Sequence, residues 1–590
     1  MIKYKCYGNH DISKKINVDE LKVSERIYTP IKSSECPVCK SRGHVVAESQ
    51  IYWCNTCRVP VYSDEKCDCC GGKVRKFAKD CRVVFPEEKL LLEIILNKPV
   101  GSLNEASVWN GSGNIFFVDG KRIAFSIAAL KELDTDKIRE KYYENEKNID
   151  YSSFNEMVDR FVKANHKRFK ETEEEAVSYI QKKMSGYRLD EMFISFSGGK
   201  DSTVVADLVS RVAAGSQGIL HIYGDTTLEF PETYRYVEEY KKTYPKRLMF
   251  SSRNKEKDFS KLCKLIGPPS RVMRWCCTIF KTGSLNRKIE SLFKKNPRVL
   301  AFQGIRRSES VSRSKYDRDS YSSKIGKQEA AAPIIDWFDF DVWLYILTTG
   351  IIFNRAYRLG YTRVGCWCCP NNSTWSEFLS KIHMHEQYTE FRQMLIDFAE
   401  KVGKPDPEVY VDNGNWKARQ GGNGLDFAKN SIVNYTPCVK EKDAFNYTLN
   451  RPVSDELYEL FKPFGKIDRY MGNSRLGEIC ILSENNVPIL RLQGRPGGVE
   501  LKVIVEQPAL LRVKNTDEAK RKIDCQITKY QMCIGCRACE SVCRFGVIKV
   551  SGEQSNTLYQ IDDKRCMKCQ ECVDHFTVGC YMRKVLAIKR

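Results

Sequence analysis

Short apolar runs that alternate with charged helical segments divide the middle of the chain into an α/β unit. Residues 192–196 form a strand-like apolar run that ends at a glycine pair, and a helix-like run follows over 203–213. Further apolar runs at 218–223 and 298–302 predict two more strands of the same parallel sheet, with helices between them. The pattern therefore predicts an α/β domain over residues 188–430.

The sequence pattern changes on both sides of this unit. Residues 1–80 are rich in cysteine and lack helical periodicity, whereas 81–135 combine one apolar helix with a hairpin and predict a small α+β domain. Charged helical sequence at 136–187 predicts a helical linker. A strand-rich α+β domain without an assigned role is expected at 431–520, and 521–590 are again rich in cysteine. We therefore expect a multidomain α/β chain with a central parallel sheet.

The composition is that of a folded multidomain protein. The chain has 590 residues, of which 42% are hydrophobic and 29% are charged. No apolar run approaches the roughly 18 residues of a membrane span, and no signal peptide is recognisable, so we expect a cytoplasmic protein without a membrane partner. Because that compartment keeps thiols reduced, the 26 cysteines are expected to bind metals. The net charge of +21 fits a nucleotide or nucleic-acid partner, or simply a basic surface.

A glycine loop lies between the first predicted strand and the first predicted helix of the α/β unit. Backbone N–H groups at such a position, together with the helix dipole, favour phosphate oxygens. The two glycines allow close approach of a ligand, and Lys200 adds a positive charge. The spacing is not that of the P-loop NTPases. We expect the loop to bind a nucleotide through Ser197, Gly198, Gly199, Lys200, Asp201 and Ser202.

The loop resembles the PP-loop of the adenine nucleotide α-hydrolase superfamily, and in particular its phosphoadenosine phosphosulfate (PAPS) reductase family. The segments 223–226, 230–233, 304–310 and 333–337 match this family in family order. The resemblance implies that an adenosine nucleotide binds at the loop, namely PAPS, adenosine 5′-phosphosulfate (APS) or ATP. It also implies nucleotide contacts from Asp225 and Thr226, and an anion held by the catalytic residues Lys200, Arg306 and Arg307. A solvated surface pair is the alternative for the two arginines.

Five cysteines inside the α/β domain form a candidate metal site. A neighbouring pair and a later loop supply enough thiolates for one cluster, and zinc or buried free thiols are the alternatives. The pairing resembles APS reductases that hold a 4Fe-4S cluster beside the nucleotide, which implies four ligands, Cys276, Cys277, Cys366 and Cys369. The fifth cysteine, Cys368, lies between the last two and could exchange roles with either.

The C-terminal cysteines have the spacing of a bacterial ferredoxin with two 4Fe-4S clusters. In that pattern the fourth cysteine of each run binds the cluster of the other run. The second run departs from it, because seven residues instead of three precede its last cysteine, and neither run ends in proline. The predicted sets are Cys533, Cys536, Cys539 and Cys580 for the first cluster, and Cys566, Cys569, Cys572 and Cys543 for the second.

The N-terminal cysteines have the arrangement of a rubredoxin-like zinc ribbon. Two cysteine pairs separated by a turn-rich stretch predict a tetrahedral Zn²⁺ site formed by Cys54, Cys57, Cys67 and Cys70. Cys36 and Cys39 form a third pair, which could replace one of the others or join Cys6 and His10 in a second site. The domain at 81–135 faintly resembles the PUA-type RNA-binding module.

The leading functional hypothesis, by resemblance, is an oxidoreductase that reduces an adenosine phosphosulfate to sulfite with electrons from its own ferredoxin domain. An electron donor protein is then a candidate partner. Family members use a nucleophilic cysteine in a C-terminal motif, but the near match at 571–575 places Cys572 within the ferredoxin spacing. Either another thiol, such as Cys368 or Cys263, takes that role, or the reaction differs.

Two other functions remain open at this point. An ATP-dependent, adenylating sulfur transferase that acts on tRNA or DNA would resemble thiolation and phosphorothioation enzymes, and the net charge of +21 favours it. The other function is that of an electron-transfer or scaffolding protein whose nucleotide domain only senses its ligand.

Overall fold

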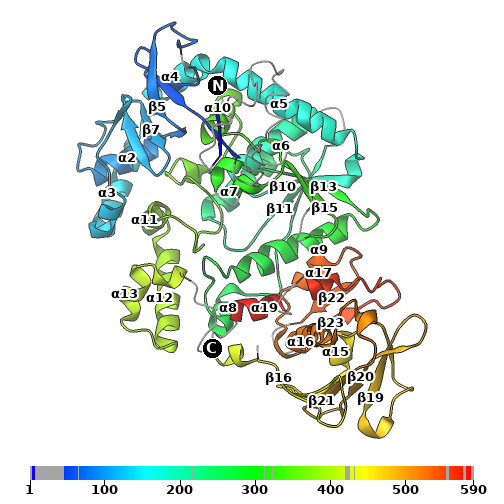
Figure 1. Ribbon diagram of the computed structural model, residues 1–590. Helices are drawn as coiled ribbons and strands as arrows, with labels where there is room; N and C mark the ends of the chain where they lie inside the picture. The colour runs from blue at the N-terminus through cyan, green and yellow to red at the C-terminus, as the bar shows by residue number, and fades with distance from the viewer. Residues whose placement is uncertain are drawn as a thin grey trace.

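The chain folds into several contiguous α/β and β layers (Figure 1). The computed structural model describes residues 3–6, 45–63, 65–213, 218–310, 313–321, 325–418, 425–430, 432–552, 557–575 and 580–586. Two small N-terminal sheets lie at one end and the C-terminal sheet at the other, with the central sheet between them. No helix in these described residues is long and apolar enough to cross a membrane.

The central sheet is mostly parallel, as the sequence predicts. Its order is β12-β11-β10-β13-β15-β14, and only the pair of β14 with β15 is antiparallel. Side chains of one strand alternate between two cores, because Ile194 and Phe196 pack in one cluster and Phe193 in another. The strands are β10 (Met192–Phe196), β11 (Leu220–Tyr223), β12 (Met249–Ser251), β13 (Val299–Gln303), β14 (Asp319–Tyr321) and β15 (Gln328–Ala331).

Helices cover both faces of this sheet. The largest core joins β10 to α4, α5, α6 and α10, and Ile289 of α9 packs on the other face. The segment 136–187, predicted as a helical linker, is helical, and Phe161 and Phe169 make it part of that core. The helices are α3 (Thr135–Asn145), α4 (Ser152–Ala164), α5 (His166–Met184), α6 (Lys200–Val212), α7 (Pro231–Thr243), α8 (Phe259–Ile266), α9 (Gly283–Leu292), α10 (Asp339–Thr349), α11 (Thr374–His383), α12 (His385–Lys401) and α13 (Pro407–Asp412).

Three antiparallel sheets precede the central domain in the part of the chain that the structure describes. The first pairs β1 with β2, the second has the order β4-β3-β5, and the third, β6-β7-β8-β9, carries helix α2 (Pro86–Ile95). Asp119 and Gly120 turn the chain between β8 and β9 with φ of 49° and 75°, as a tight hairpin requires. The strands are β1 (Lys3–Cys6), β2 (Val45–Glu48), β3 (Ile51–Cys54), β4 (Val59–Val61), β5 (Val74–Ala78), β6 (Cys81–Val83), β7 (Val108–Gly111), β8 (Ile115–Val118) and β9 (Lys121–Arg122).

The C-terminal part combines a six-stranded antiparallel sheet with the ferredoxin segment. Helix α16 (Thr516–Met532) joins the two, so the boundary expected at residue 520 falls inside a helix. One core contains Leu492 of the sheet, Ile523 of α16 and Val573 of the ferredoxin segment. The remaining α-helices and strands are α14 (Asp426–Lys429), β16 (Asn434–Pro437), β17 (Ala444–Thr448), α15 (Asp455–Glu459), β18 (Lys466–Asp468), β19 (Glu478–Leu482), β20 (Pro488–Gln493), β21 (Glu500–Val505), α17 (Ala538–Val542), β22 (Ile548–Ser551), β23 (Leu558–Ile561), α18 (Glu571–Asp574) and α19 (Tyr581–Leu586).

Candidate functional site

The glycine loop lies at the point where the strand order of the central sheet reverses. The chain moves outward from β10 to β11 and β12, and then returns to place β13 on the other side of β10. In open α/β sheets, ligands bind at such a switch point, outside the carboxyl ends of the strands. The loops after β10 and β13 touch here, since a Cβ on Gly304 would lie 2.6 Å from the Asp201 backbone. The predicted nucleotide loop therefore occupies the expected crevice.

The loop itself is held by short polar contacts. Gly198 has φ of 72°, which favours glycine, and a Cβ there would lie 2.7 Å from a methyl group of Thr233. The Ser197 N–H donates to Ser202 Oγ at 3.2 Å, and the Ser202 hydroxyl donates to the Gly199 carbonyl at 2.9 Å. These contacts fix a tight turn at the start of α6.

Two buried cations of the site are already paired with two carboxylates. Lys200 and Arg306 have exposed fractions of 3% and 4%. Arg306 lies 2.5 Å from Asp201 and 2.7 Å from Asp339, and Lys200 lies 3.4 and 3.3 Å from the same two groups. Although burial opposes ionisation, Arg306 and Lys200 lower the pKa of Asp201 to about 2. The sequence analysis missed Asp339, because its partners are more than 30 residues away.

The other predicted nucleotide residues occupy different surroundings. The Asp225 carboxylate accepts the Thr227 N–H at 2.9 Å just beyond β11, and Thr227 has φ of 66°. Thr226 donates its hydroxyl to Glu229 at 2.7 Å. Arg307 pairs with Asp336 at 2.5 Å and donates to the Tyr316 carbonyl, rather than to the carboxylates around Arg306.

A carboxylate from the N-terminal part also reaches this site. Asp80, between β5 and β6, accepts the backbone N–H groups of Asp339 and Phe340, both at 3.0 Å. It therefore caps the N-terminus of α10, the helix that begins with Asp339. Burial and the neighbouring carboxylate of Asp339 raise the pKa of Asp80 to about 7. The sequence gives no signal for this contact, which spans about 260 residues.

The cysteines of the central domain gather beside the nucleotide segment. Cys277 begins a π-helical stretch, Cys277–Thr282, a distortion that often marks functional sites. The Cys276 thiol interacts electrostatically with those of Cys277, Cys366 and Cys368. Thr226 Oγ1 lies 3.3 Å from Cys366 Sγ, so the nucleotide segment and the cysteine loop are in contact.

The two thiols that the sequence offers as nucleophiles are buried. Cys368 is 5% exposed and Cys263 is 2% exposed, within one apolar cluster. A reactive thiolate requires access and a positive environment, and apolar burial provides neither. Neither thiol has the surroundings of an attacking group.

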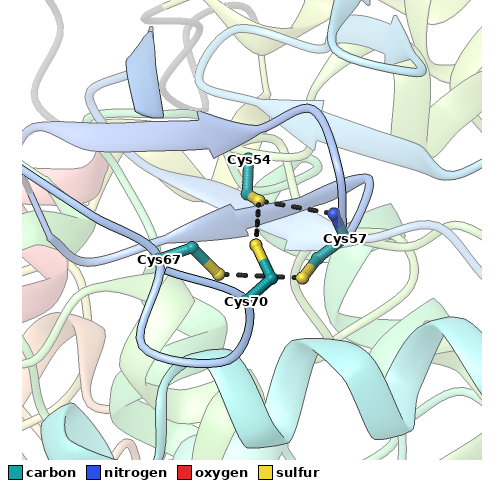
Figure 2. Close-up of side chains that lie close together, drawn as sticks. All are labelled: Cys54, Cys57, Cys67 and Cys70. Atoms are coloured by element: carbon teal, nitrogen blue, oxygen red, sulfur yellow. Dashed lines mark hydrogen bonds between the residues drawn. The ribbon is translucent and has the colours of Figure 1, made fainter. Parts of the chain in front are cut away.

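The N-terminal set of four cysteines converges tightly (Figure 2). Cys54 and Cys70 Sγ lie 3.4 Å apart, and Cys57 and Cys67 Sγ lie 3.7 Å apart. Tetrahedral zinc with bonds of about 2.3 Å would space its sulfurs by about 3.8 Å. Burial and the neighbouring thiols raise the pKa of Cys54 to about 11, so four thiolates here require a cation. The donor set fits the predicted zinc ion.

The ferredoxin cysteines lie near one another, and their division into two ligand sets stays a prediction, since Cys572 also interacts with Cys539. Cys536 interacts with Cys580, Cys539 and Cys533, and these four line a small cavity. The Cys566 thiol interacts with those of Cys543 and Cys569, and the Cys572 thiol with those of Cys543 and Cys566. Among the residues that the structure describes, the only metal-binding group with all ligand atoms within 4.8 Å is the N-terminal one. The wider spacing elsewhere fits a cluster of several atoms.

One buried lysine lies between the two ferredoxin sets. Lys529 of α16 is 1% exposed and donates to the Cys572 carbonyl and to Gln526, both at 2.8 Å. It interacts electrostatically with Cys539 and Cys580 of the first set and with Cys572 of the second. The sequence analysis did not identify this residue.

A cavity of about 950 Å³ opens beside the cysteine loop of the central domain. Thr227 and Asn254, beyond the ends of β11 and β12, line it together with Trp367, Phe259 of α8 and Phe391 of α12. Its lining also includes exposed side chains of both charges, namely the cations Arg253, Lys255 and Lys264 and the carboxylates Asp258, Glu390 and Asp397. Its volume is within the range of small-molecule sites.

Part of the predicted N-terminal metal chemistry lies outside the described residues. This holds for His10, Cys36 and Cys39, and Cys6 is described only as the last residue of β1. A second N-terminal metal site therefore stays a prediction.

Comparison with known proteins identifies two family domains. Residues 191–372 match the phosphoadenosine phosphosulfate reductase domain, and residues 532–575 match a 4Fe-4S dicluster domain. Two uncharacterized proteins of Methanocaldococcus jannaschii are each 31% identical, over 49% and 45% of this chain. The matches span 66% and 54% of those two relatives, which is less than two thirds of either.

Enzymes with an assigned activity match about a third of the chain. The adenosine 5′-phosphosulfate reductase of Neisseria meningitidis is 30% identical over 31% of this chain and 72% of its own length. A crystal structure of the PAPS reductase of Candida auris with phosphate covers 33% of this chain and 89% of that one, at 16% identity and a TM-score of 0.26. That score is too low to support an argument from the fold.

Proposed function

Because the chain belongs to the phosphoadenosine phosphosulfate reductase family, we propose that it is an iron–sulfur enzyme that reduces an adenosine phosphosulfate to sulfite. Its own ferredoxin domain supplies the electrons. The observation that carries this proposal is the contact of 3.3 Å between Thr226 of the nucleotide segment and Cys366 of the cysteine loop. A nucleotide beside Thr226 would have its phosphosulfate close to redox-active ligands.

The cysteine sets provide suitable ligands for the implied cofactors. The central-domain set would hold one 4Fe-4S cluster, and the ferredoxin sets would hold two, which supply single electrons when bound. The donors are cysteine side chains, most of them buried or half-buried, and four of them line one cavity. The N-terminal set would hold structural zinc.

The protein residues near the loop bind and orient the anion. The Lys200 N–H at the start of α6 already donates to the Tyr357 hydroxyl at 2.9 Å, so the N–H groups that follow it, with the cations Lys200 and Arg306, attract the phosphosulfate oxygens. Asp201 and Asp339 fix both cations and keep them charged before the nucleotide arrives. We assign Arg307 a positioning role, since its partner Asp336 lies in the segment that leads to α10.

The reaction consumes two electrons. When the sulfur–oxygen bond breaks, one electron pair stays on the phosphate oxygen of the nucleotide and the other becomes the lone pair of sulfite. No thiol needs to form a covalent intermediate in this scheme. The scheme agrees with the burial of Cys368 and Cys263, and with the position of Cys572 close to other cysteines of the ferredoxin segment.

A second candidate function is ATP-dependent sulfur transfer to a nucleic acid. Two observations favour it. Carboxylate oxygens of Asp201 and Asp339 at the loop are the kind of ligand that magnesium takes beside a triphosphate. The cavity beside Trp367, with aromatic walls and exposed cations, would accept a nucleobase and its phosphate. In this scheme ATP would adenylate the acceptor and release pyrophosphate.

One assay distinguishes the two functions. The anaerobic, reduced protein is incubated with PAPS, APS or ATP, the last with and without tRNA or DNA. Sulfite from a phosphosulfate supports the reductase, whereas pyrophosphate that depends on nucleic acid supports the transferase. Absence of both products contradicts the two functions and leaves the sensing role.

Matched variants connect the assay to the site. Arg306→Gln is expected to lower product formation more than a hundredfold, because it removes a charge-assisted contact to the anion. Arg298→Gln, an exposed arginine just before β13, is the control and is expected to retain wild-type turnover. Equal activity of the two variants would contradict the assigned anion site.

A further inference from the structure

The two ferredoxin sites differ in where they lie. Cys536 and Cys580 of the first set are buried in an apolar cluster that also contains Trp275 and Cys368 of the central domain. In the second set, Cys569 is exposed and the neighbouring Met567 is 63% exposed. The first set therefore faces the inside of the molecule, while the second reaches its surface.

The first set is fixed against helix α9 of the central domain (Figure 1). A Cβ on Gly283, the first residue of α9, would lie 3.4 Å from the Cys536 carbonyl, so the two backbones are in close contact. Arg287 of α9 forms a two-point ion pair with Glu540 at 2.9 and 3.0 Å. Glu256 joins Arg287 at 2.8 Å to Arg537 at 2.6 Å. The junction is therefore fixed by charge-assisted contacts on both sides of the cysteines.

Tyr581 connects the first ferredoxin set with the central-domain set. It follows the ligand Cys580 directly and lines the cavity surrounded by the four cysteines. Its hydroxyl donates to the Arg274 carbonyl at 3.4 Å and bonds Thr278 in the π-helical stretch. It also interacts electrostatically with Cys536 of the first ferredoxin set and with Cys276 and Cys277 of the central domain.

We propose that electrons enter the nucleotide domain only through the first ferredoxin site, across the contact made by Tyr581. The second site receives them from a low-potential one-electron donor protein at the surface. Each transfer moves one electron without breaking a bond, and two transfers in succession supply the reduction of one phosphosulfate. The inference rests on the proposed function for its final acceptor, but the order of the sites does not depend on the substrate.

The last ferredoxin cysteine stands next to the residue that contacts the central domain. Seven residues separate Cys572 from Cys580, where the ferredoxin pattern has three. Cys580 directly precedes α19, and the first residue of that helix, Tyr581, contacts the central domain.

Rapid reduction of the full-length protein tests the proposal. Anaerobic protein with about twelve iron atoms per chain is mixed with dithionite without nucleotide, frozen at intervals and studied by electron paramagnetic resonance. Tyr581→Leu is expected to slow reduction of the central-domain centre at least tenfold, while the ferredoxin centres are reduced as in wild type. Tyr581→Phe retains the ring and is expected to stay within about threefold of wild type.

The outcomes are distinguishable from those of the turnover assay. An unchanged rate in Tyr581→Leu with wild-type iron content would overturn the proposal, as would a chain that binds only about eight iron atoms. Magnetic coupling between the central-domain centre and a ferredoxin centre should persist in Cys569→Ser and disappear in Cys536→Ser. The opposite pattern would show that electrons enter the nucleotide domain through the second ferredoxin site. The reduction experiment contains no nucleotide. Its results can therefore be interpreted even if the turnover assay yields no sulfite.

Discussion

The N-terminal and C-terminal ends of the molecule both reach the nucleotide site, but by different physical means. The zinc ribbon reaches it through one carboxylate, Asp80, which caps the helix that starts at Asp339. The ferredoxin segment reaches it through an apolar junction around Tyr581. Cysteines converge within 4.8 Å at the first end and surround a cavity at the second. Under the proposed function, cysteines at one end would stabilise the structure through zinc, and cysteines at the other end would hold the clusters that supply electrons.

Removal of zinc is expected to have the largest effect. Cys57→Ala should abolish zinc binding and unfold the ribbon, because structural zinc contributes on the order of 10 kcal/mol in small domains. The exposed Cys69, next to Cys70 but outside the set, provides the control Cys69→Ser. Zinc content and limited proteolysis report the result. If the ribbon resists proteolysis without zinc, the N-terminal cysteines are not needed to stabilise its fold.

Loss of one ferredoxin ligand is expected to abolish one cluster without affecting the other metal sites. Cys536→Ser should reduce the iron content by about four atoms per chain while zinc stays bound. Cys525→Ser is the matched control, since Cys525 is buried in the same part of the molecule but belongs to neither set. Iron analysis and visible absorption measure the difference. Equal iron in both variants would contradict the ligand assignment.

Lys529 is expected to affect the reduction potentials of the ferredoxin sites but not the binding of their clusters. Its buried positive charge stabilises the more negative, reduced state of both, so Lys529→Met should shift both reduction potentials to more negative values. Lys522→Met, on the same helix but paired with Asp574, should shift them less. Potentiometric titration gives the values. A shift confined to one site would show that the lysine serves that site alone.

Substitution of Asp80 is expected to have the smallest effect, which is a change in how the stability of the folded protein depends on pH. The folded protein keeps this proton up to about pH 7, whereas an unfolded chain releases it near 3.8, so the contribution to stability falls as the pH rises between these values. Asp80→Asn should lose this slope and about 1 kcal/mol of capping energy below pH 5. Chemical denaturation from pH 5 to 8 tests this. An unchanged slope would show that Asp80 does not titrate there.

The features that could be predicted from the sequence are those that short motifs encode. The glycine loop, the parallel strands and the cysteine sets depend on local spacing, and the family domains confirm the nucleotide and ferredoxin parts. Asp80, Asp339 and Tyr581 were missed because their roles arise from contacts between distant segments. A lone aspartate or tyrosine carries no spacing signal, so only the folded chain identifies these residues.

Domain boundaries were less predictable, for a related reason. The sequence places a division at residue 520 because strands give way to cysteines there, but α16 continues across it. Apolar residues on that helix, such as Ile523 and Ile527, belong to the core shared with the sheet. A change in composition therefore does not mark a change of core.

This shared core limits how the ferredoxin segment can be separated from the rest of the protein. A ferredoxin cut out at the apparent boundary would expose one face of α16, including Ile523 and Ile527, and would lack the sheet that covers it. The ferredoxin segment is therefore not a self-contained folding unit. Transplanting it onto another enzyme would require the antiparallel sheet to be moved with it.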